Sequence, residues 1–238
     1  MKDKKLLSDI KEYLKCYENQ VLEDWYELIR HISVSETGEG IETCCDWIQK
    51  KMEEIGIQVT KYSVKPAPVL VGRFGNDPEK KTVLIYAHYD VKPAGERKLW
   101  HSDPFVPTVR DGKVYARGSA DNKSPLMAHL KALEYFIRRK MEVPVNVIFV
   151  FEGDEECGSR GLEEFLAEHR TELAADLVFF SDGPKDPSGL PIIALGAKGD
   201  LSIHITVETM NRNVHARYAP VLPSVAVSGD IGKVQIKR

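Results

Sequence analysis

The sequence has little of what marks a secreted, membrane-spanning or nucleic-acid-binding protein. Its four cysteines are Cys16, Cys44, Cys45 and Cys157, and they form no C-x-x-C pair, so neither a disulfide framework nor a zinc-finger motif is indicated. No run of ~18 apolar residues is present to span a membrane. Residues 1–5 are not followed by the apolar stretch of a signal peptide. We therefore expect reduced cysteines in a cytoplasmic protein.

An excess of charge of one sign is also missing. Lysine and arginine number 33 against 36 aspartates and glutamates, for a net charge of -3. There is no basic stripe and no interleaving of aromatic with basic residues, so nucleic acid is not an expected partner. Hydrophobic residues make up 42% of the 238 residues, which is enough for one large or two smaller domains with a buried core.

Apolar runs and amphipathic stretches alternate along the first part of the chain. Three runs rich in valine, isoleucine and phenylalanine are typical of strands that bury both faces, and they cover residues 82–87, 145–151 and 176–181. Further strands are expected at residues 58–64, 69–74 and 113–116, and helices at 3–30, 40–55, 123–140 and 159–169. This alternation predicts an α/β fold with a mostly parallel sheet and helices on both faces.

Two segments depart from this alternation. Residues 92–112 contain three prolines and are predicted to form a long irregular loop, which in a compact domain is usually functional. Residues 201–209 alternate strictly between apolar and polar side chains, as in a half-exposed strand of an antiparallel sheet. We therefore expect a first, α/β domain over residues 1–196 and the start of a second, α+β domain over residues 197–238.

Histidine and acidic residues follow the three apolar runs. His88 and Asp90 come after the first, Glu155 after the second and Asp182 after the third, while Asp121 precedes an expected helix. Ligands of open α/β sheets bind beyond the carboxyl ends of the strands. One imidazole with several carboxylates and no thiolate is the ligand set of a hydrolytic metal site. The sequence therefore predicts such a site.

Each cluster also has a plainer explanation. His88 and Asp90 suit a surface pair at a strand end, and Asp121 suits a helix N-cap. Glu155 and Glu156 suit a solvated acidic loop, and Asp182 suits a turn. Four clusters at related positions favour the metal site over four separate coincidences. Cys157 is not favoured as a ligand, because sulfur is more typical of closed structural sites.

Four segments together carry a resemblance to a known family. They resemble the dinuclear metallopeptidases of the aminoacylase, carboxypeptidase and carnosinase type, and residues 89–93 (YDVKP) are most similar to the dipeptidase branch. The segments are residues 86–93, 103–105, 111–123 and 152–159, within a likeness that extends over about residues 25–226. The resemblance implies a zinc-peptidase-like α/β fold into which a lid or dimerisation domain is inserted.

The resemblance also implies a metal centre with two divalent cations, most typically Zn²⁺, with Mn²⁺ or Co²⁺ as alternatives. His88 and Asp182 would hold one cation, Glu156 would hold the second, and Asp121 would bridge both. The peptide bond that follows Asp121 would be cis.

The activity implied by the resemblance is hydrolysis of dipeptides or short peptides. Glu155 would serve as general acid/base towards a metal-activated water, and Asp90 would orient the imidazole of His88. The protein would form a homodimer through the inserted domain, with His215 reaching the active site of the partner subunit. Two alternatives stay open: an N-acyl amino acid deacylase or desuccinylase, and a truncated metal-binding relative without turnover.

The chain departs from the family pattern at three places. Ser124 stands where the family usually has glycine, and His215 is followed by Ala216 where the family often has serine. The family takes a further metal-binding histidine from a later segment, and no histidine follows His215 here. We therefore expect the chain to be a fragment, a truncated product or an isoform.

Overall fold

The computed structural model describes residues 2–183, 188, 190, 192, 224–227 and 234–237. The chain divides into two units, Met1–Pro184 and Lys185–Arg238. In the second unit, β8 (Ser224–Val227) and β9 (Val234–Lys237) form an antiparallel pair. The domain boundary expected near residue 196 and the strand expected at residues 201–209 lie outside the described residues.

The first unit is built around a five-stranded sheet in the order β1-β2-β6-β3-β7. Its strands are β1 (Gln58–Tyr62), β2 (Val69–Phe74), β3 (Thr82–His88), β6 (Asn146–Glu152) and β7 (Leu177–Phe180). β3 runs parallel to both β6 and β7, whereas β2 runs antiparallel to its neighbours β1 and β6. Only β2 therefore opposes the direction of the other four strands, and the predicted mostly parallel sheet is confirmed.

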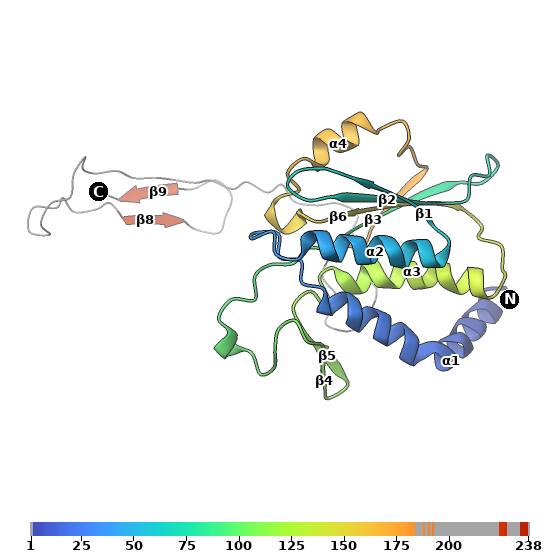
Figure 1. Cartoon of the computed structure of the whole chain (residues 1–238), viewed down its shortest axis with the longest axis horizontal. Helices are drawn as coiled ribbons and strands as arrows, with labels where there is room; N and C mark the ends of the chain where they lie inside the picture. The colour runs from blue at the N-terminus through green and yellow to red at the C-terminus, as the bar shows by residue number, and fades with distance from the viewer. Residues whose placement is uncertain are drawn as a thin grey trace, which may run out of the picture. The chain divides into compact units, whose positions relative to one another are not determined.

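Helices cover both faces of this sheet, as predicted (Figure 1). α2 (Ile41–Ile55) and α3 (Lys123–Arg138) pack on one face, and the short α4 (Leu162–Glu168) packs on the other. α1 (Lys2–Arg30) lies against α3 on the side away from the sheet. Although α1 has 29 residues, no helix in the described part of the chain is both long and apolar enough to cross a membrane.

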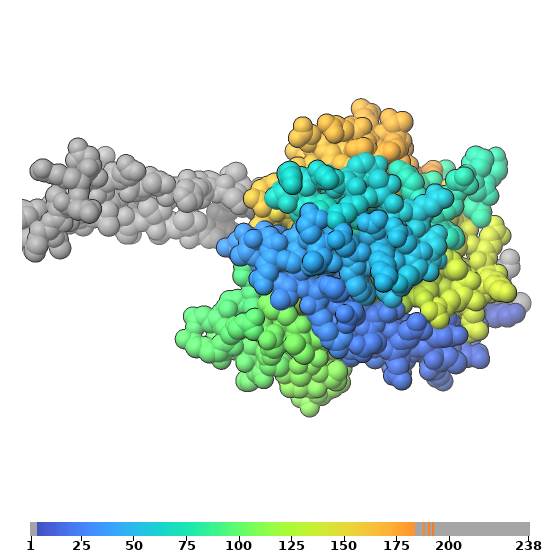
Figure 2. Space-filling view, viewed as in Figure 1, coloured from blue at the N-terminus to red at the C-terminus, as the bar shows by residue number. Residues whose placement is uncertain are grey.

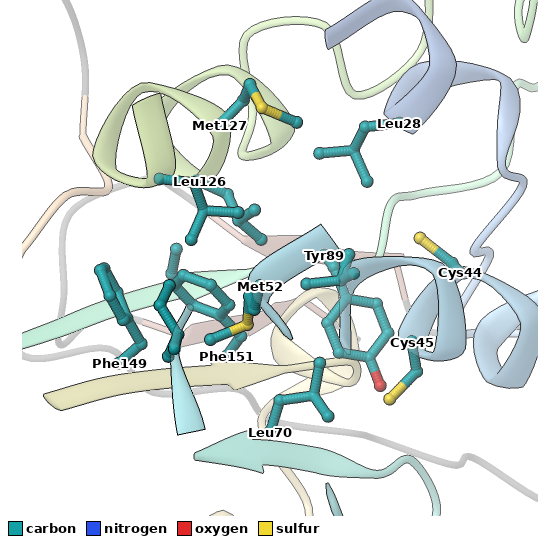
Figure 3. Packing of buried hydrophobic residues seen from close by; sticks show 14 of the residues in the cluster. Leu28, Cys44, Cys45, Met52, Leu70, Tyr89, Leu126, Met127, Phe149 and Phe151 are labelled. Carbon is teal, nitrogen blue, oxygen red and sulfur yellow. The ribbon is translucent and has the colours of Figure 1, made fainter. Parts of the chain in front are cut away.

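Strand β6 is continuously apolar because both of its faces are buried. Its alternate side chains point to opposite faces of the sheet: Phe149 and Phe151 enter the core beneath α2 and α3, and Ile148 and Val150 enter the core beneath α4. Figure 3 shows both phenylalanines packed among side chains of the surrounding helices and strands. Full burial of one such side chain stabilises the fold by about 1.5–3 kcal/mol. The two cores therefore fix β6 from both sides.

Strand β7 differs from the prediction. It forms at the expected place, but its side chains are not buried: Leu177, Val178, Phe179 and Phe180 are 56%, 58%, 48% and 61% exposed. The reason is its position, since β3 is the only described strand beside it and β7 forms the edge of the sheet. The prediction of a strand within residues 176–181 is therefore confirmed, and the prediction that this strand is buried is wrong.

The segment expected to be an irregular loop has some regular structure. It contains a 3₁₀ turn, η1 (Arg97–Leu99), and β4 (Thr108–Arg110), which pairs with β5 (Lys113–Tyr115). In Figure 2 this segment, residues 92–115, is the green lobe at the surface of the first unit. Its strands belong to a separate two-stranded sheet and do not extend the central one.

Candidate metal centre

The predicted site residues stand where four elements begin or end. His88 is the last residue of β3 and is fully buried. Glu155 begins the 3₁₀ turn η2 (Glu155–Cys157) just after β6, and Asp182 lies two residues after β7. Asp121 comes directly before Asn122, the N-cap residue of α3. Because β3, β6 and β7 are parallel, their carboxyl ends meet at one edge of the sheet.

The structure brings three of the predicted metal ligands together. The Nε2 atom of His88 lies 3.0 Å from an Asp121 carboxylate oxygen and 3.4 Å from one of Asp182. One ligand atom from each of the three residues lies within 4.8 Å of the other two. An imidazole nitrogen and two carboxylate oxygens are donors that suit Zn²⁺ and similar divalent cations. The donor set therefore fits a divalent metal ion.

Asp90 lies behind His88 and connects it to the turn after β6. Its carboxylate is fully buried, 3.3 Å from Nδ1 of His88. It also accepts hydrogen bonds from the backbone N–H groups of Glu155 (3.1 Å) and Glu156 (3.0 Å). Burial alone would raise the pKa of Asp90, but the interactions with His88, the Ser35 hydroxyl and backbone N–H outweigh it and lower the pKa. The charged carboxylate of Asp90 thus contacts both His88 and the backbone of the turn η2.

The crowding of acidic groups shifts two further pKa values. Burial acts to lower the pKa of His88, but the hydrogen bond to Asp90 and the nearby carboxylates outweigh it and raise this pKa to about 9. Burial raises the pKa of Glu155, and the charges of Asp182 and Glu156 add to that effect while His88 opposes it. The cluster therefore concentrates negative charge of the kind that a bound cation compensates.

Glu156, a predicted metal ligand, is not one of the three residues of this group. Glu156 faces Lys92, whose ammonium nitrogen lies 3.6 Å from its carboxylate and also donates to its backbone carbonyl. Its assignment to a second metal stays a prediction. His215 lies outside the described residues. Glu155 stands closer to the centre, with a carboxylate oxygen 3.7 Å from His88 Nε2.

The structure adds residues that the sequence pattern did not single out. Ser35 hydrogen-bonds the Asp90 carboxylate and accepts from the Cys157 thiol at 3.5 Å. The Asp121–Asn122 peptide bond is cis, as the resemblance implies, and the Asn122 side chain donates a hydrogen bond to the carbonyl of Ser181, the residue after β7. Nothing in the charge or periodicity of the sequence marks these polar residues, because their contacts lie between segments far apart in the chain.

The family follows from comparison with known proteins. Residues 84–231 match the model of "Peptidase family M20/M25/M40". This match covers more than half of the 238 residues, and the chain belongs to this family. Its placement agrees with the resemblance derived from the sequence segments, since both include the carboxyl ends of β3, β6 and β7.

Similar proteins are named for dipeptidase activity. The chain is 40% identical over 172 residues to the Cys-Gly metallodipeptidase of Schizosaccharomyces pombe and 34% identical over 172 residues to the human Beta-Ala-His dipeptidase. These matches cover 70% and 69% of this chain but only 36% and 34% of the relatives, so the chain spans little more than a third of their length.

Solved structures of the same family resemble the fold. Human carnosine dipeptidase 1 superimposes with a TM-score of 0.71 at 29% identity, over 74% of this chain and 41% of that protein. The M20 family metallo-carboxypeptidase Sso-CP2 from Sulfolobus solfataricus gives a TM-score of 0.68 at 36% identity, over 71% of this chain and 38% of its own.

Proposed function

We propose that the chain carries the first part of the catalytic domain of a metal-dependent peptidase that hydrolyses dipeptides or short peptides. The observation that carries this proposal is the convergence of His88, Asp121 and Asp182, whose ligand atoms lie within 4.8 Å of one another. The relatives named for Cys-Gly and Beta-Ala-His dipeptidase activity support dipeptides as the substrate class.

Four side chains would hold two divalent cations, with Zn²⁺ the expected metal. His88 and Asp182 would hold the first, Asp121 would be shared, and Glu156 would bind the second after leaving its contact with Lys92. When bound, divalent cations of this kind polarise a carbonyl oxygen and lower the pKa of water.

Glu155 is the proposed general acid/base. Its carboxylate oxygen is 3.7 Å from His88 Nε2, and its side chain is 35% exposed, so it stands beside the metal ligands while remaining open to a substrate. In this role it takes a proton from the attacking water and returns it to the departing amine. Asp90 holds the Nδ1 proton of His88 between its backbone carbonyl (3.1 Å) and its carboxylate (3.3 Å), which leaves Nε2 turned towards Asp121 and Asp182.

The proposal includes assembly as a homodimer in which His215 reaches the active site of the partner subunit. A preorganised donor to a developing oxyanion contributes about 2.7–4 kcal/mol in another hydrolase. His215→Ala would then lower kcat without removing metal in an assembled dimer.

Metal titration tests the core of the proposal. Isothermal titration of the metal-free chain with Zn²⁺, Mn²⁺ and Co²⁺ should show binding that His88→Ala abolishes or strongly weakens. His101→Ala removes an exposed histidine from the segment between β3 and β4, and this variant should bind the metal ions as the unchanged protein does. No binding at all, or equal binding by His88→Ala, would contradict the metal centre.

A substrate panel tests the reaction class. Cys-Gly, β-Ala-His and N-acetyl amino acids would be assayed with the metal-loaded chain and with any longer product of the same gene. Hydrolysis of the dipeptides supports the proposal. Hydrolysis of the N-acetyl amino acids alone would favour a deacylase, and metal binding without turnover of either would favour a relative that binds metal without catalysis.

A further inference from the structure

One hydrogen bond joins the segments that carry two of the metal ligands. The side-chain Nδ2 of Asn122 donates to the backbone carbonyl of Ser181 at 2.8 Å. Asn122 directly follows Asp121, and Ser181 directly precedes Asp182. The bond therefore spans from the start of α3 to the end of β7, next to both carboxylates. The Asn122 side chain is almost completely buried, at 1% exposed.

We propose that Asn122 is a positioning residue that sets the separation between the carboxylates of Asp121 and Asp182, and thereby the affinity of the site for a divalent cation. This inference rests on the proposed metal site. Asn122 acts through its neighbours and contacts neither substrate nor reacting atoms.

The need for such an anchor follows from the surroundings of Asp121. Its side chain is 66% exposed, and its carboxylate lies 3.0 Å from Nε2 of His88. An exposed carboxylate has little packing to hold it, so its place depends on the backbone that carries it. Holding ligands in a productive geometry is the usual task of the groups behind them, and loss of one typically weakens metal binding ~10–100-fold.

The two ends of the connection are held differently. On the α3 side, the ammonium of Lys123 donates to the carbonyls of Leu28 (3.1 Å) and His31 (2.5 Å), which fixes the start of the helix independently of Asn122. On the other side, β7 is an edge strand with β3 as its only described neighbour. Loss of the Asn122 bond is therefore expected to release chiefly the end of β7, and with it Asp182.

A contribution to fold stability does not by itself explain why residue 122 is an asparagine. The Ser181 carbonyl can only accept a hydrogen bond, so Nδ2 must face it and Oδ1 must point away. Oδ1 of Asn122 is buried and meets no donor among the described residues. A buried acceptor without a partner costs free energy, which offsets the gain from the Ser181 bond. The amide is better explained by what its position does for the two neighbouring carboxylates.

The test compares Zn²⁺ affinity, measured by competition with a chelator, across three variants. Asn122→Ala should bind ~10–100-fold more weakly than the unchanged protein. Asn122→Asp keeps the size of the side chain but loses the donor and adds a negative charge, which by itself would attract a cation more strongly. Weaker binding by Asn122→Asp would therefore identify the lost hydrogen bond as the cause.

Asn146→Ala is the matched control. Asn146 is a buried asparagine at the opposite end of the sheet, where its amide bonds the backbone N–H and carbonyl of Asp77 at 3.0 and 2.8 Å. Its loss should lower the denaturation midpoint in urea while leaving Zn²⁺ affinity unchanged. An equal loss of affinity in Asn146→Ala would overturn the inference, since the effect would then follow from general destabilisation.

Hydrogen exchange of the metal-free protein provides a readout that needs no metal. Asn122→Ala or Asn122→Asp should speed amide exchange at residues 178–183 but not at residues 75–82, and Asn146→Ala should do the reverse. Unchanged exchange at residues 178–183, or unchanged Zn²⁺ affinity in folded Asn122 variants, would overturn the inference. If the unchanged protein showed no His88-dependent Zn²⁺ binding, the proposed function would fail, and the exchange data would still decide whether Asn122 anchors β7.

Discussion

Asp90 contacts two parts of the candidate site, His88 and the turn η2. It contacts the far nitrogen of His88 and two backbone N–H groups of the turn η2, all from a fully buried position. A buried carboxylate is costly unless it is hydrogen-bonded, and here each partner is also part of the site. One side chain therefore contacts both the imidazole of His88 and the backbone of the two adjacent glutamates.

The two glutamates of η2 are predicted to have separable roles. Glu155→Gln should leave metal content nearly unchanged but lower turnover ~10²–10⁴-fold in an active form of the enzyme, the usual effect of losing a general base. Glu156→Gln should weaken the binding of one metal instead. Metal analysis of both purified variants, with a dipeptide assay, checks this division. Indistinguishable behaviour of the two variants would show that the assignment of roles is wrong.

The cysteines are predicted to differ sharply in reactivity. Burial raises the pKa of the Cys45 thiol to about 12, and it also raises the pKa of the fully buried Cys44, whereas Cys16 is exposed. Because the thiolate is the reactive form, a disulfide reagent at pH 8 should label the exposed Cys16 quickly, and Cys44 and Cys45 only after unfolding. In the Cys16→Ser variant the half-buried Cys157 is the remaining cysteine outside the core, and the fast phase should fall by the share that Cys16 contributes. Rapid labelling of Cys44 or Cys45 in the folded protein would argue against the packing shown in Figure 3.

At the scale of elements, the position of α1 depends on polar contacts as well as packing. The ring of Tyr13 on α1 packs edge-on against Tyr135 of α3, with centroids 5.1 Å apart. Lys131 of α3 forms ion pairs with Asp24 on α1 and with Glu134. These contacts bring the carboxyl end of α1 to the start of α3. The same docking therefore positions the helix that follows Asp121.

Lys123 is predicted to be the main polar contact of this junction. It is 1% exposed, and burial lowers its pKa, yet its ammonium donates to the carbonyls of Leu28 and His31. Lys123→Met would leave these carbonyls without that donor and should reduce the free energy of unfolding by about 1–3 kcal/mol. Urea denaturation measures the change, with Lys11→Met on the exposed side of α1 as the control.

An unchanged or higher stability of Lys123→Met would have a definite meaning. It would show that burying the ammonium group costs more than its two hydrogen bonds contribute, as happens for some buried charges. The role of Lys123 would then be to position the start of α3 and not to stabilise the fold.

At the scale of the whole molecule, the edge at β7 is a feature of the described chain that is open to association. Four consecutive apolar side chains are exposed there, and β3 is the only described strand that pairs with β7. Unpaired strand edges with apolar side chains template pairing with other chains, and charged residues on an edge suppress it.

We predict concentration-dependent self-association of the chain through β7. Val178→Lys should reduce it, as measured by sedimentation velocity over a range of concentrations. Val109→Lys is a matched control, because Val109 on β4 is 57% exposed and Val178 is 58% exposed. A chain that stays monomeric at high concentration, or associates equally in both variants, would contradict this role of the edge.

The sequence alone predicted the helices and the central-sheet strands of the first unit, and the three site residues whose ligand atoms the structure brings together. Apolar runs at residues 82–87 and 145–151 predicted β3 and β6, because strands that are buried on both faces have continuously apolar sequences. The strand-end rule predicted that His88 and Asp182 lie near one another because the carboxyl ends of parallel strands share one edge, and Asp121 joins them from the start of a helix. These inferences needed only local pattern and a general property of α/β sheets.

Only the tertiary structure decided that the β7 side chains are exposed and which polar contacts surround the metal ligands. An apolar run looks the same whether its strand lies inside a sheet or at the edge, so the exposure of Leu177–Phe180 depends on which strands are its neighbours. The bonds from Asn122 to Ser181 and from Ser35 to Asp90 each join residues more than 50 positions apart. Such polar pairings follow from how the packed elements meet, and no periodicity along the chain encodes them.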